Sequence, residues 1–389
     1  MVFFRRDEIK FIQISMPTCE RCLNTELKYF AKVNGNWVCR RCIGFQGEDA
    51  QEVLTVDAVD YHLNFKLTLA QNEISKACRE LSRENDILIN AVCGAGKTEL
   101  VMETIKDHLN RSLNVGVAVA RRQVALQLYE RFKTAFPSIK VTVVCEGHTQ
   151  DISGNLIITT THQLYRYRKH FDCLILDEPD AFPFRNNPVL NGFMRQAVKG
   201  HIIYLTATPD PSLLKQVRQG KLTLLSLNVR PHHVPLPIPR LIYSPFWVQV
   251  IVLWWILRRS KKMWLIFVPS VKRGKVLSKI LRLPFVHASS DHLDELIQAF
   301  KDKRIPRLLS TTVLERGVTF SDIQVAVLQA DHQVFDTAVL TQIAGRVGRD
   351  PAFPKGEVKF LCFRSTSALR NCLKDLSKAN QSVLTASVI

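Results

Sequence analysis

The chain has 389 residues, 46% of them hydrophobic and 23% charged, which is the profile of a globular protein with room for two or three domains. It contains no internal repeats and no low-complexity tract, so repeat architectures are excluded. The 53 Lys and Arg exceed the 35 Asp and Glu, giving a net charge of +18. This excess favours polyanionic partners such as nucleic acid or anionic lipid, with a merely solvated basic surface as the alternative.

Four of the ten cysteines form two CxxC pairs separated by sixteen residues: Cys19 and Cys22, then Cys39 and Cys42. Two such turns can place four thiolates around one tetrahedral zinc ion. Asn34-Gly35 between them predicts a hairpin. Disulfides and a redox dithiol are the alternatives, but the other six cysteines are scattered, and the opening MVFFRRDEIKFIQIS predicts no secretory signal. We therefore predict a structural zinc ribbon within residues 1–50.

The segment AVCGAGKT predicts a phosphate-binding loop. It follows an apolar strand at 87–91 and precedes an amphipathic helix, which is the context that such a loop requires. Its glycines let backbone N–H groups approach the phosphates, Lys97 can reach the β- and γ-phosphates, and the Thr98 hydroxyl can hold Mg²⁺. The predicted nucleotide contacts are Gly94, Ala95, Gly96, Lys97 and Thr98.

Two later apolar strands end in polar residues. FDCLIL runs into Asp177 and Glu178, and HIIYL runs into Thr206-Ala207-Thr208. Ligands of parallel sheets lie at the carboxyl ends of the strands, so Asp177 is placed to hold Mg²⁺ and Glu178 to orient or deprotonate the attacking water. The two threonines could relay the state of the γ-phosphate. The alternation of strands and helices predicts a parallel α/β domain over residues 51–228.

A proline-rich stretch over 229–240 predicts an extended linker, and the α/β pattern resumes over 241–389 without a second GKT. The second domain is therefore not expected to bind its own ATP. Its run FWVQVIVLWWIL, residues 246–257, is too short to cross a bilayer as a helix, which takes about 20 residues. We predict a core helix there, with a membrane-surface helix as the alternative.

The segment QIAGRVGRD carries two arginines, Arg346 and Arg349, among glycines that allow close approach. A second domain can present them to a phosphate held by the first, where such an arginine accelerates phosphoryl transfer by about 10³–10⁵. Gln342 can complete the network. Because these side chains engage only when the cleft closes, hydrolysis becomes coupled to domain motion.

In this order, AVCGAGKT, DEPD, TAT, TTVLERGVT and QIAGRVGR resemble the motifs of superfamily 2 helicases and translocases. With the four-cysteine ribbon and DEPDAFPF, the chain resembles the ComFA family, the late-competence DNA-uptake ATPases of Gram-positive bacteria. The resemblance implies two RecA-like parallel-sheet α/β domains in tandem behind a zinc ribbon, with ATP, Mg²⁺ and Zn²⁺ as cofactors. It also implies that Gln71 contacts adenine, and that Gly317 joins Thr206 and Thr208 in coupling.

The same resemblance implies a cytoplasmic motor, free or peripheral at the inner face of the cell membrane, that draws single-stranded DNA through a membrane uptake channel. Its implied partner is a small competence protein of the phosphoribosyltransferase type. A homo-oligomer is a further candidate, on which the sequence is silent. Nucleic acid would lie across the tops of both domains. The candidates for contacting it are Arg121, Arg122, Thr160, Thr161, Ser270, Thr311 and Thr312.

Two other classes stay open at this stage. A helicase of repair or replication restart would need a strand-separating element, and no long insertion supplies one. A nucleotide-gated DNA-binding or assembly protein with a vestigial ATPase would not need Lys97, Asp177, Glu178 and Arg349 together. RNA also stays open as the polymer, because the same core serves both nucleic acids.

Overall fold

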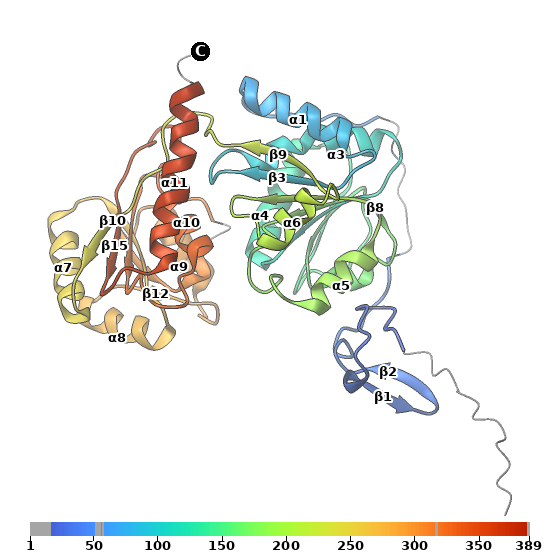
Figure 1. The fold of residues 1–389 in the computed structure, drawn as a ribbon, viewed down its shortest axis with the longest axis horizontal. Helices are drawn as coiled ribbons and strands as arrows, with labels where there is room; N and C mark the ends of the chain where they lie inside the picture. The colour runs from blue at the N-terminus through green and yellow to red at the C-terminus, as the bar shows by residue number, and fades with distance from the viewer. Residues whose placement is uncertain (1–16, 51–55, 57, 316–317, 387–389) are drawn as a thin grey trace, which may run out of the picture.

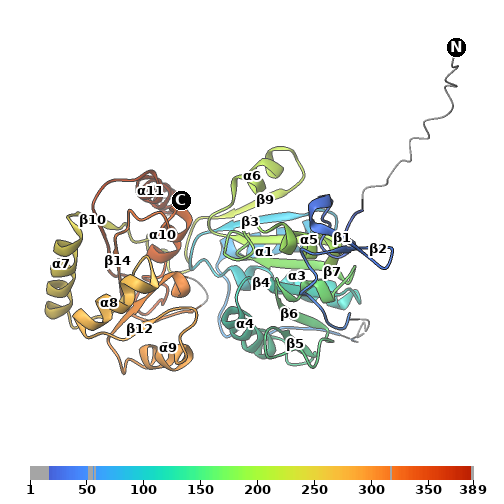
Figure 2. The same cartoon turned by 90° about the horizontal axis from the view of Figure 1, so that it is seen from below.

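Two α/β domains lie side by side in the computed structural model, and a small hairpin ribbon sits at the outer end of the first domain (Figures 1 and 2). The structure describes residues 17–50, 56, 58–315 and 318–386, without the side chains of 382–386. The fold class predicted from the sequence is thereby confirmed. The predicted domain boundaries at residues 50, 228 and 240 remain predictions.

The first domain is a seven-stranded sheet in the order β5-β6-β4-β7-β8-β3-β9, and all of its pairings are parallel. Its strands are mostly short apolar runs, as expected where helices cover both faces. The strands are β3 (Ile87–Ala91), β4 (Val115–Val119), β5 (Val141–Val144), β6 (Leu156–Thr160), β7 (Phe171–Asp177), β8 (Val198–Thr206) and β9 (Thr223–Leu227). The helices are α1 (Leu69–Leu81), α2 (Lys97–Leu100), α3 (Met102–Asn110), α4 (Arg122–Ala135), α5 (Pro188–Ala197) and α6 (Pro211–Arg218), with a 3-10 turn η2 (Gln163–Arg166).

Helices cover both faces of this sheet. Helices α1 to α4 cover one face, where Ile105 and Phe132 share a core with Ile89. Helices α5 and α6 cover the other, where Phe193 joins Leu174. With both faces closed, the carboxyl ends of the strands remain as the edge at which a ligand can bind.

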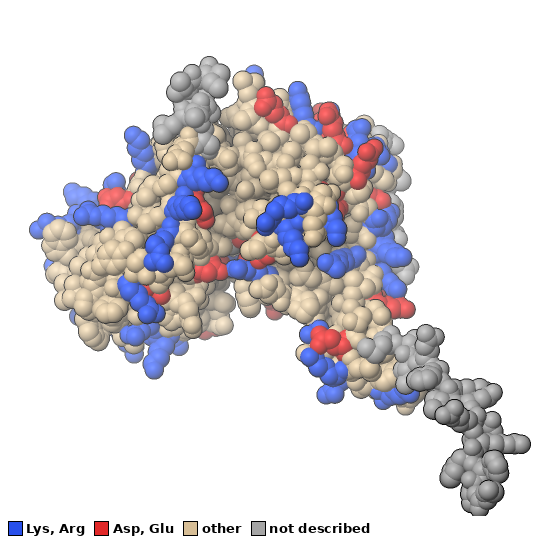
Figure 3. Space-filling view, viewed as in Figure 1, with Lys and Arg blue, Asp and Glu red and all other residues tan. Residues whose placement is uncertain are grey.

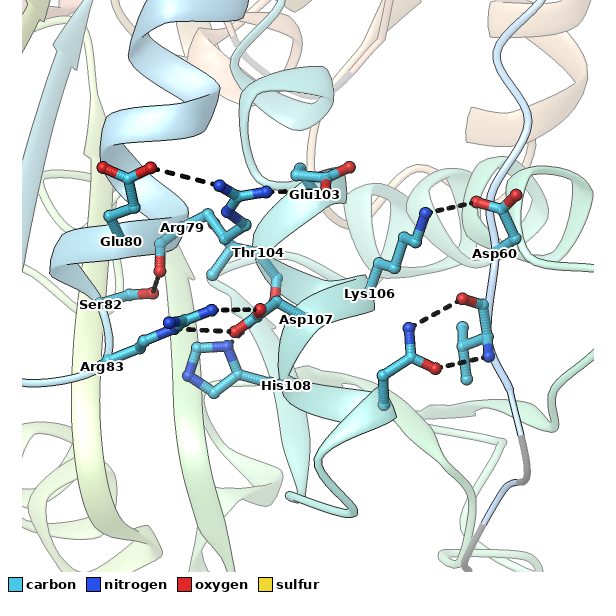
Figure 4. A network of polar contacts seen from close by, with 12 residues as sticks. Asp60, Arg79, Glu80, Ser82, Arg83, Glu103, Thr104, Lys106, Asp107 and His108 are labelled. Carbon is cyan, nitrogen blue, oxygen red and sulfur yellow. Dashed lines mark hydrogen bonds and ion pairs between the residues drawn. The ribbon is translucent and has the colours of Figure 1, made fainter.

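Ion pairs join α1 to α3 on the outside of the first domain (Figure 4). Arg79 lies 3.4 Å from Glu103, and Arg83 lies 2.6 Å from Asp107. These side chains are partly exposed, so each pair contributes only about 0–1 kcal/mol. Their effect is positional, because α1 carries Gln71 and α3 continues the helix that follows the phosphate loop.

The second domain is a six-stranded parallel sheet in the order β10-β15-β14-β11-β13-β12. One face is covered by α9, α10 and α11 and the other by α7 and α8. The strands are β10 (Arg240–Tyr243), β11 (Met263–Phe267), β12 (Phe285–Val286), β13 (Arg307–Ser310), β14 (Ile323–Leu328) and β15 (Val358–Cys362). The helices are α7 (Phe246–Arg259), α8 (Val271–Leu281), α9 (Leu293–Lys301), α10 (Thr337–Ala344) and α11 (Ser367–Ala386), with a 3-10 turn η3 (Thr312–Leu314).

The sequence predicts a core helix at residues 246–257, but only one face of α7 is buried. Val250, Leu253 and Leu257 pack against the sheet, but Trp247 and Ile251 face outward and are exposed. The sheet packs against one face of this helix. The tryptophans of the other face stay about half exposed or more, with the Arg258 and Arg259 guanidinium groups over two of the rings. No helix among the described residues is long and apolar enough to span a membrane.

The ribbon packs on the first domain. Strands β1 (Phe30–Val33) and β2 (Asn36–Cys39) are antiparallel, and Asn34 and Gly35 between them have positive φ angles of 50° and 83°, which confirms the predicted hairpin. Just beyond it, the rings of Phe45 and Phe193 lie 4.9 Å apart. The ribbon therefore shares a core with α5 and is not a freely tethered module.

Candidate nucleotide site between the two domains

The phosphate loop connects β3 to α2 through two left-handed glycines. Gly94 has φ +84° and Gly96 has φ +80°, a backbone conformation that residues other than glycine rarely adopt. A Cβ at Gly96 would also lie 2.6 Å from Nε2 of Gln71, so a larger residue would have to displace the Gln71 amide. The loop turns through a hydrogen bond from the Ala95 N–H to the Val92 carbonyl at 3.0 Å, and α2 begins at Lys97. Thr98 follows in the first turn, as predicted.

Gln71 is buried and braces the phosphate loop. Its Nε2 donates to the Ala95 carbonyl at 2.9 Å, and its Oε1 accepts from the Thr68 N–H at 2.9 Å in a capping box that starts α1. The side chain thus lies at the nucleotide loop, on the helix that the ion pairs hold in place. Its contact with adenine remains a prediction.

Asp177 and Glu178 lie where β7 ends, next to β8. Glu178 adopts φ +55°, and its N–H donates to the Leu205 carbonyl at 2.8 Å. The next carboxylate, Asp180, accepts hydrogen bonds from the hydroxyls of both Thr206 and Thr208, each at 2.6 Å. The predicted coupling threonines are therefore joined to the acidic strand end directly, while Gly317 lies outside the described residues.

The two arginines of the second domain occupy different environments. Arg346 is 1% exposed, and it donates to the carbonyls of Glu315, at 2.9 Å, and of Val318. Burial, with a contribution from neighbouring Arg349, holds the pKa of Arg346 well below its ordinary value, and nearby Glu178 opposes that shift. Arg349 is only partly buried and donates to the Gly345 carbonyl at 2.9 Å.

The phosphate loop and the arginine segment touch across the domain interface, which we call the seam. The Cys93 thiol donates to Oε1 of Gln342 at 3.0 Å, and a Cβ on Gly345 would lie 2.4 Å from that of Cys93. Two buried donors here, Nε2 of Gln342 and Nη2 of Arg346, have no hydrogen-bond partner among the described residues. Buried donors are normally satisfied, so these fit a site that receives an acceptor such as a nucleotide phosphate.

Arg230 closes the seam, and the sequence analysis missed it. It is 2% exposed, and its guanidinium reaches the Cys93 carbonyl at 2.8 Å and the carbonyls of Gly345, Val347 and Gly348 at 2.7–3.1 Å. Burial lowers the pKa of Arg230 to about 10, so the group is still charged at neutral pH. Its sequence neighbourhood, inside the proline-rich stretch, gave no sign of this role, because its partners lie more than a hundred residues away.

Ion pairs also cross between the domains away from the phosphate loop. Arg121 lies 3.0 Å from Glu315 and donates to the Val313 carbonyl at 2.7 Å. Arg185 lies 2.6 Å from Asp336, which caps α10. Arg185 and Asp336 also line an interdomain cleft of about 660 Å³. Val92, Cys93 and Gly345 line the same cleft, so it opens onto the seam, although Lys97, Asp177 and Glu178 do not line it.

The four ribbon cysteines form one cluster. All four sulfurs lie within 4.8 Å of one another, with Cys19 and Cys42 at 3.5 Å and Cys22 and Cys39 at 3.7 Å, and none is in a disulfide. Sulfurs held tetrahedrally at 2.3 Å from zinc lie about 3.8 Å apart. The arrangement therefore fits a four-thiolate zinc site and does not fit disulfide pairing.

Comparison with known proteins identifies the family. The family "Type III restriction enzyme, res subunit" matches residues 64–211, and "Helicase conserved C-terminal domain" matches residues 248–351. The chain is 32% identical over 407 residues to "Competence protein ComFA" of Bacillus subtilis (strain 168), covering 93% of this chain and 85% of that protein. The chain belongs to the ComFA family. The ComFA protein of Streptococcus pneumoniae (strain R6) is 31% identical, covering 93% of this chain and 90% of that protein.

Solved structures support the same fold for this ComFA-family chain. Saccharomyces cerevisiae Dbp5 bound to RNA and ADP BeF3 superposes with a TM-score of 0.62 at 16% identity, covering 81% of this chain and 92% of that one. RecG bound to a three-way DNA junction superposes with a TM-score of 0.57 at 20% identity, covering 83% and 47%. These likenesses concern the fold alone. Family membership and the two helicase-type domains make the chain an ATPase of the superfamily 2 helicase and translocase type.

The predicted nucleic-acid contacts of this ComFA-family chain lie at or just beyond strand ends, but they differ in access. Thr160 and Thr161 are buried, Ser270 caps α8, and Thr311 and Thr312 are partly buried after β13. Arg122 donates to the Glu146 carbonyl, and Arg121 is engaged with the second domain as described. Their contact with nucleic acid remains a prediction.

Proposed function

We propose that this ComFA-family chain is an ATP-dependent translocase on single-stranded DNA that drives uptake of transforming DNA across the cytoplasmic membrane during competence. The observation that carries the proposal is the seam, where the phosphate loop meets the segment of the other domain that carries Arg346 and Arg349. Asp177 and Glu178 lie at the end of β7, in the same domain as the loop. Family membership supplies the link to competence.

The residues of the seam divide the work of ATP hydrolysis. Lys97 holds the β- and γ-phosphates, with the loop N–H groups around Gly94 and Gly96. Thr98 and Asp177 hold Mg²⁺, which when bound supplies neutralising charge to the phosphate oxygens. Glu178 orients the attacking water and takes its proton.

The arginines complete the site from the second domain. Arg349 neutralises the charge that develops on the γ-phosphate, and Arg346 holds the loop that presents it and turns its remaining N–H toward the same phosphates. Gln342 contributes its amide in the same way. Because both domains are needed, hydrolysis and separation of the domains alternate.

The link to DNA runs through the neighbours of Glu178. Asp180 accepts hydrogen bonds from Thr206 and Thr208, so a shift of the acidic loop that follows β7 moves the carboxyl end of β8. Arg121 joins the first domain to the loop after β13, beside Thr311 and Thr312. A strand of DNA laid across these loops is gripped and released as the seam closes and opens.

The remaining parts of the proposal rest on the family alone. The chain works in the cytoplasm at the inner face of the membrane, beside the uptake channel, with a small phosphoribosyltransferase-type partner and other copies of itself. The four-cysteine ribbon holds structural Zn²⁺, as its sulfur spacing suits.

The test is ATP hydrolysis by the zinc-loaded full chain with and without single-stranded DNA, beside Lys97→Ala. We expect single strands to stimulate hydrolysis about tenfold or more, and Lys97→Ala to abolish it. Duplex DNA and RNA are the comparison polymers, and weaker stimulation by both supports the uptake role. Hydrolysis that ignores DNA in the wild type overturns the motor in favour of a nucleotide-gated assembly protein, and strand separation of a duplex favours a repair helicase.

A further inference from the structure

Helix α7 exposes a continuous apolar stripe. Trp247 is 64% exposed, Ile251 63%, Trp254 48% and Trp255 49%, and Val248 lies beside them. Residues at spacings of three, four and seven share one face of a helix, so these five form a single stripe along α7. The opposite face of α7 is already packed on the second sheet.

This stripe lies far from the nucleotide site. In both views α7 is at the end of the second domain that points away from the first domain (Figures 1 and 2). Helix α8, in the same layer, also exposes Val276 and Ile280. A surface of this size and aromatic content is unusual for a protein face in contact with water, and marks a site of interaction.

The charges on α7, α8 and the segment between them are of one sign, and Asp331, which lines a hollow with Phe246 and Gln249, comes from another element. Residues 246–290 contain no Asp or Glu. Among the charged side chains at the left of Figure 3, where α7 and α8 lie, basic ones predominate. The nearby Glu357 lies 2.7 Å from Lys359 and is already paired. The basic residues of α7, α8 and their connection are Arg258, Arg259, Lys261, Lys262, Lys272, Arg273, Lys275, Lys279 and Arg282.

We infer that α7 docks on an anionic lipid surface. A helix that lies along a bilayer buries aromatic and aliphatic side chains at the headgroup boundary and keeps basic residues beside them, which is the arrangement seen here. The segment 246–282 meets both requirements at once, because its apolar stripe is continuous and its flanking charges are all positive.

Single-stranded DNA fits the same surface less well. Base stacking needs free ring faces along a groove. Here the Arg259 guanidinium lies 3.9 Å from the centre of the Trp255 ring, and Arg258 lies 5.2 Å from that of Trp254. The aliphatic Val248 and Ile251 between the rings offer no stacking surface to a base.

The inference does not depend on the proposed DNA translocation, because lipid binding needs neither ATP nor DNA. The experiment measures co-sedimentation of the full chain with phosphatidylglycerol–phosphatidylcholine vesicles and with pure phosphatidylcholine vesicles. The test variants are Trp247→Ser/Ile251→Ser for the stripe and Lys261→Gln/Lys262→Gln for the charge. Trp37→Ser, an exposed tryptophan on the ribbon, is the matched control.

We expect the wild type to bind anionic vesicles, the stripe variant to bind about tenfold more weakly or worse, and the control to bind like the wild type. The charge variant should bind more weakly than the wild type at low salt, and the difference between the two should shrink as salt is added. Hydrolysis without vesicles should be unchanged in the stripe variant, which shows that it is folded. Absence of vesicle binding by the wild type, or equal binding by the stripe variant, overturns the inference. Loss of DNA binding or of self-association in that variant, without vesicle binding, would reassign the surface to DNA or to a second copy.

Discussion

The seam between the domains buries cations, whereas the outer face of α7 exposes tryptophans. Arg230 and Arg346 are 2% and 1% exposed, while Trp247 is 64% exposed. Both arrangements reverse the usual distribution of these residue types. In the seam the reversal is compensated within the chain, since backbone carbonyls accept from both guanidinium groups. On α7 two guanidinium groups lie over tryptophan rings but still leave those rings about half exposed.

This difference shows what each region is for. A buried charge supplied with acceptors costs desolvation but fixes one geometry, as expected of groups that must meet a phosphate in a defined position. The free-energy cost of exposing an apolar stripe to water is not offset by contacts within the chain. It is removed only when a surface outside the chain covers the stripe. The seam is therefore complete apart from its substrate, and α7 is incomplete without a partner surface.

Among the variants that test the comparison between the seam and α7, Arg349→Ala is expected to have the largest effect on ATP hydrolysis. Within the described part of the chain this arginine donates a hydrogen bond to the Gly345 carbonyl alone, so its removal should leave the thermal unfolding midpoint nearly unchanged. The loss of charge at the γ-phosphate should lower kcat about 10³-fold, or about 4 kcal/mol. The measurement is single-turnover ATP hydrolysis beside thermal unfolding. Arg346→Ala is the contrast, because its buried carbonyl contacts predict a clear fall in stability. An equal loss of stability in both variants would contradict the division of roles.

The contact between the ribbon and the first domain is a third region to compare, and there the apolar residues are buried in the ordinary way. Cys39→Ser should release the metal and lower the free energy of unfolding by about 3 kcal/mol or more, since the ribbon shares a core with α5. Zinc content and thermal unfolding measure this. The basal kcat of the folded protein should stay close to that of the wild type, because none of the ribbon residues 17–50 contacts the seam. A fall in kcat with an unchanged unfolding midpoint would mean that the ribbon takes part in hydrolysis.

A smaller and more selective effect is expected from Arg230→Met. The substitution removes the guanidinium that links the Cys93 carbonyl to those of Gly345 and Gly348, and so loosens the phosphate loop from the arginine segment. We expect the DNA-stimulated kcat to fall about tenfold, or about 1.4 kcal/mol, and the basal rate to fall less.

Arg230→Lys should not restore the DNA response, because an ammonium lacks the planar fork that reaches several carbonyls at once. The kcat and KM for ATP, each with and without single-stranded DNA, make the test. A wild-type response in Arg230→Lys would show that charge alone is needed. Lower stability with an unchanged DNA response would leave Arg230 a structural residue.

Local pattern was enough to predict the parts that depend on neighbours in sequence. The strand predicted at 87–91 is β3, and the turn predicted at Asn34-Gly35 is the ribbon hairpin. The order of motifs was enough to bring Lys97, Asp177 and Glu178 to one edge of a parallel sheet, because parallel strands all end there. Family membership, proposed from the same motifs, is confirmed by the comparisons.

Contacts between residues far apart in the chain could not be predicted from the sequence. Nothing beside Arg230 indicates that its acceptors include Cys93 and Gly348, and nothing beside Arg121 indicates Glu315. A run such as 246–257 is apolar on all sides, so its composition could not say which face the sheet would cover.

The sequence by itself determined the class of chemistry and the fold, because glycines in a phosphate loop, paired cysteines and apolar periodicity act over a few residues. Only the tertiary structure decided which arginines are buried at the seam and which tryptophans remain in water. Those outcomes depend on how two sheets and their helices meet in space, and a linear pattern carries no record of which surfaces are left uncovered.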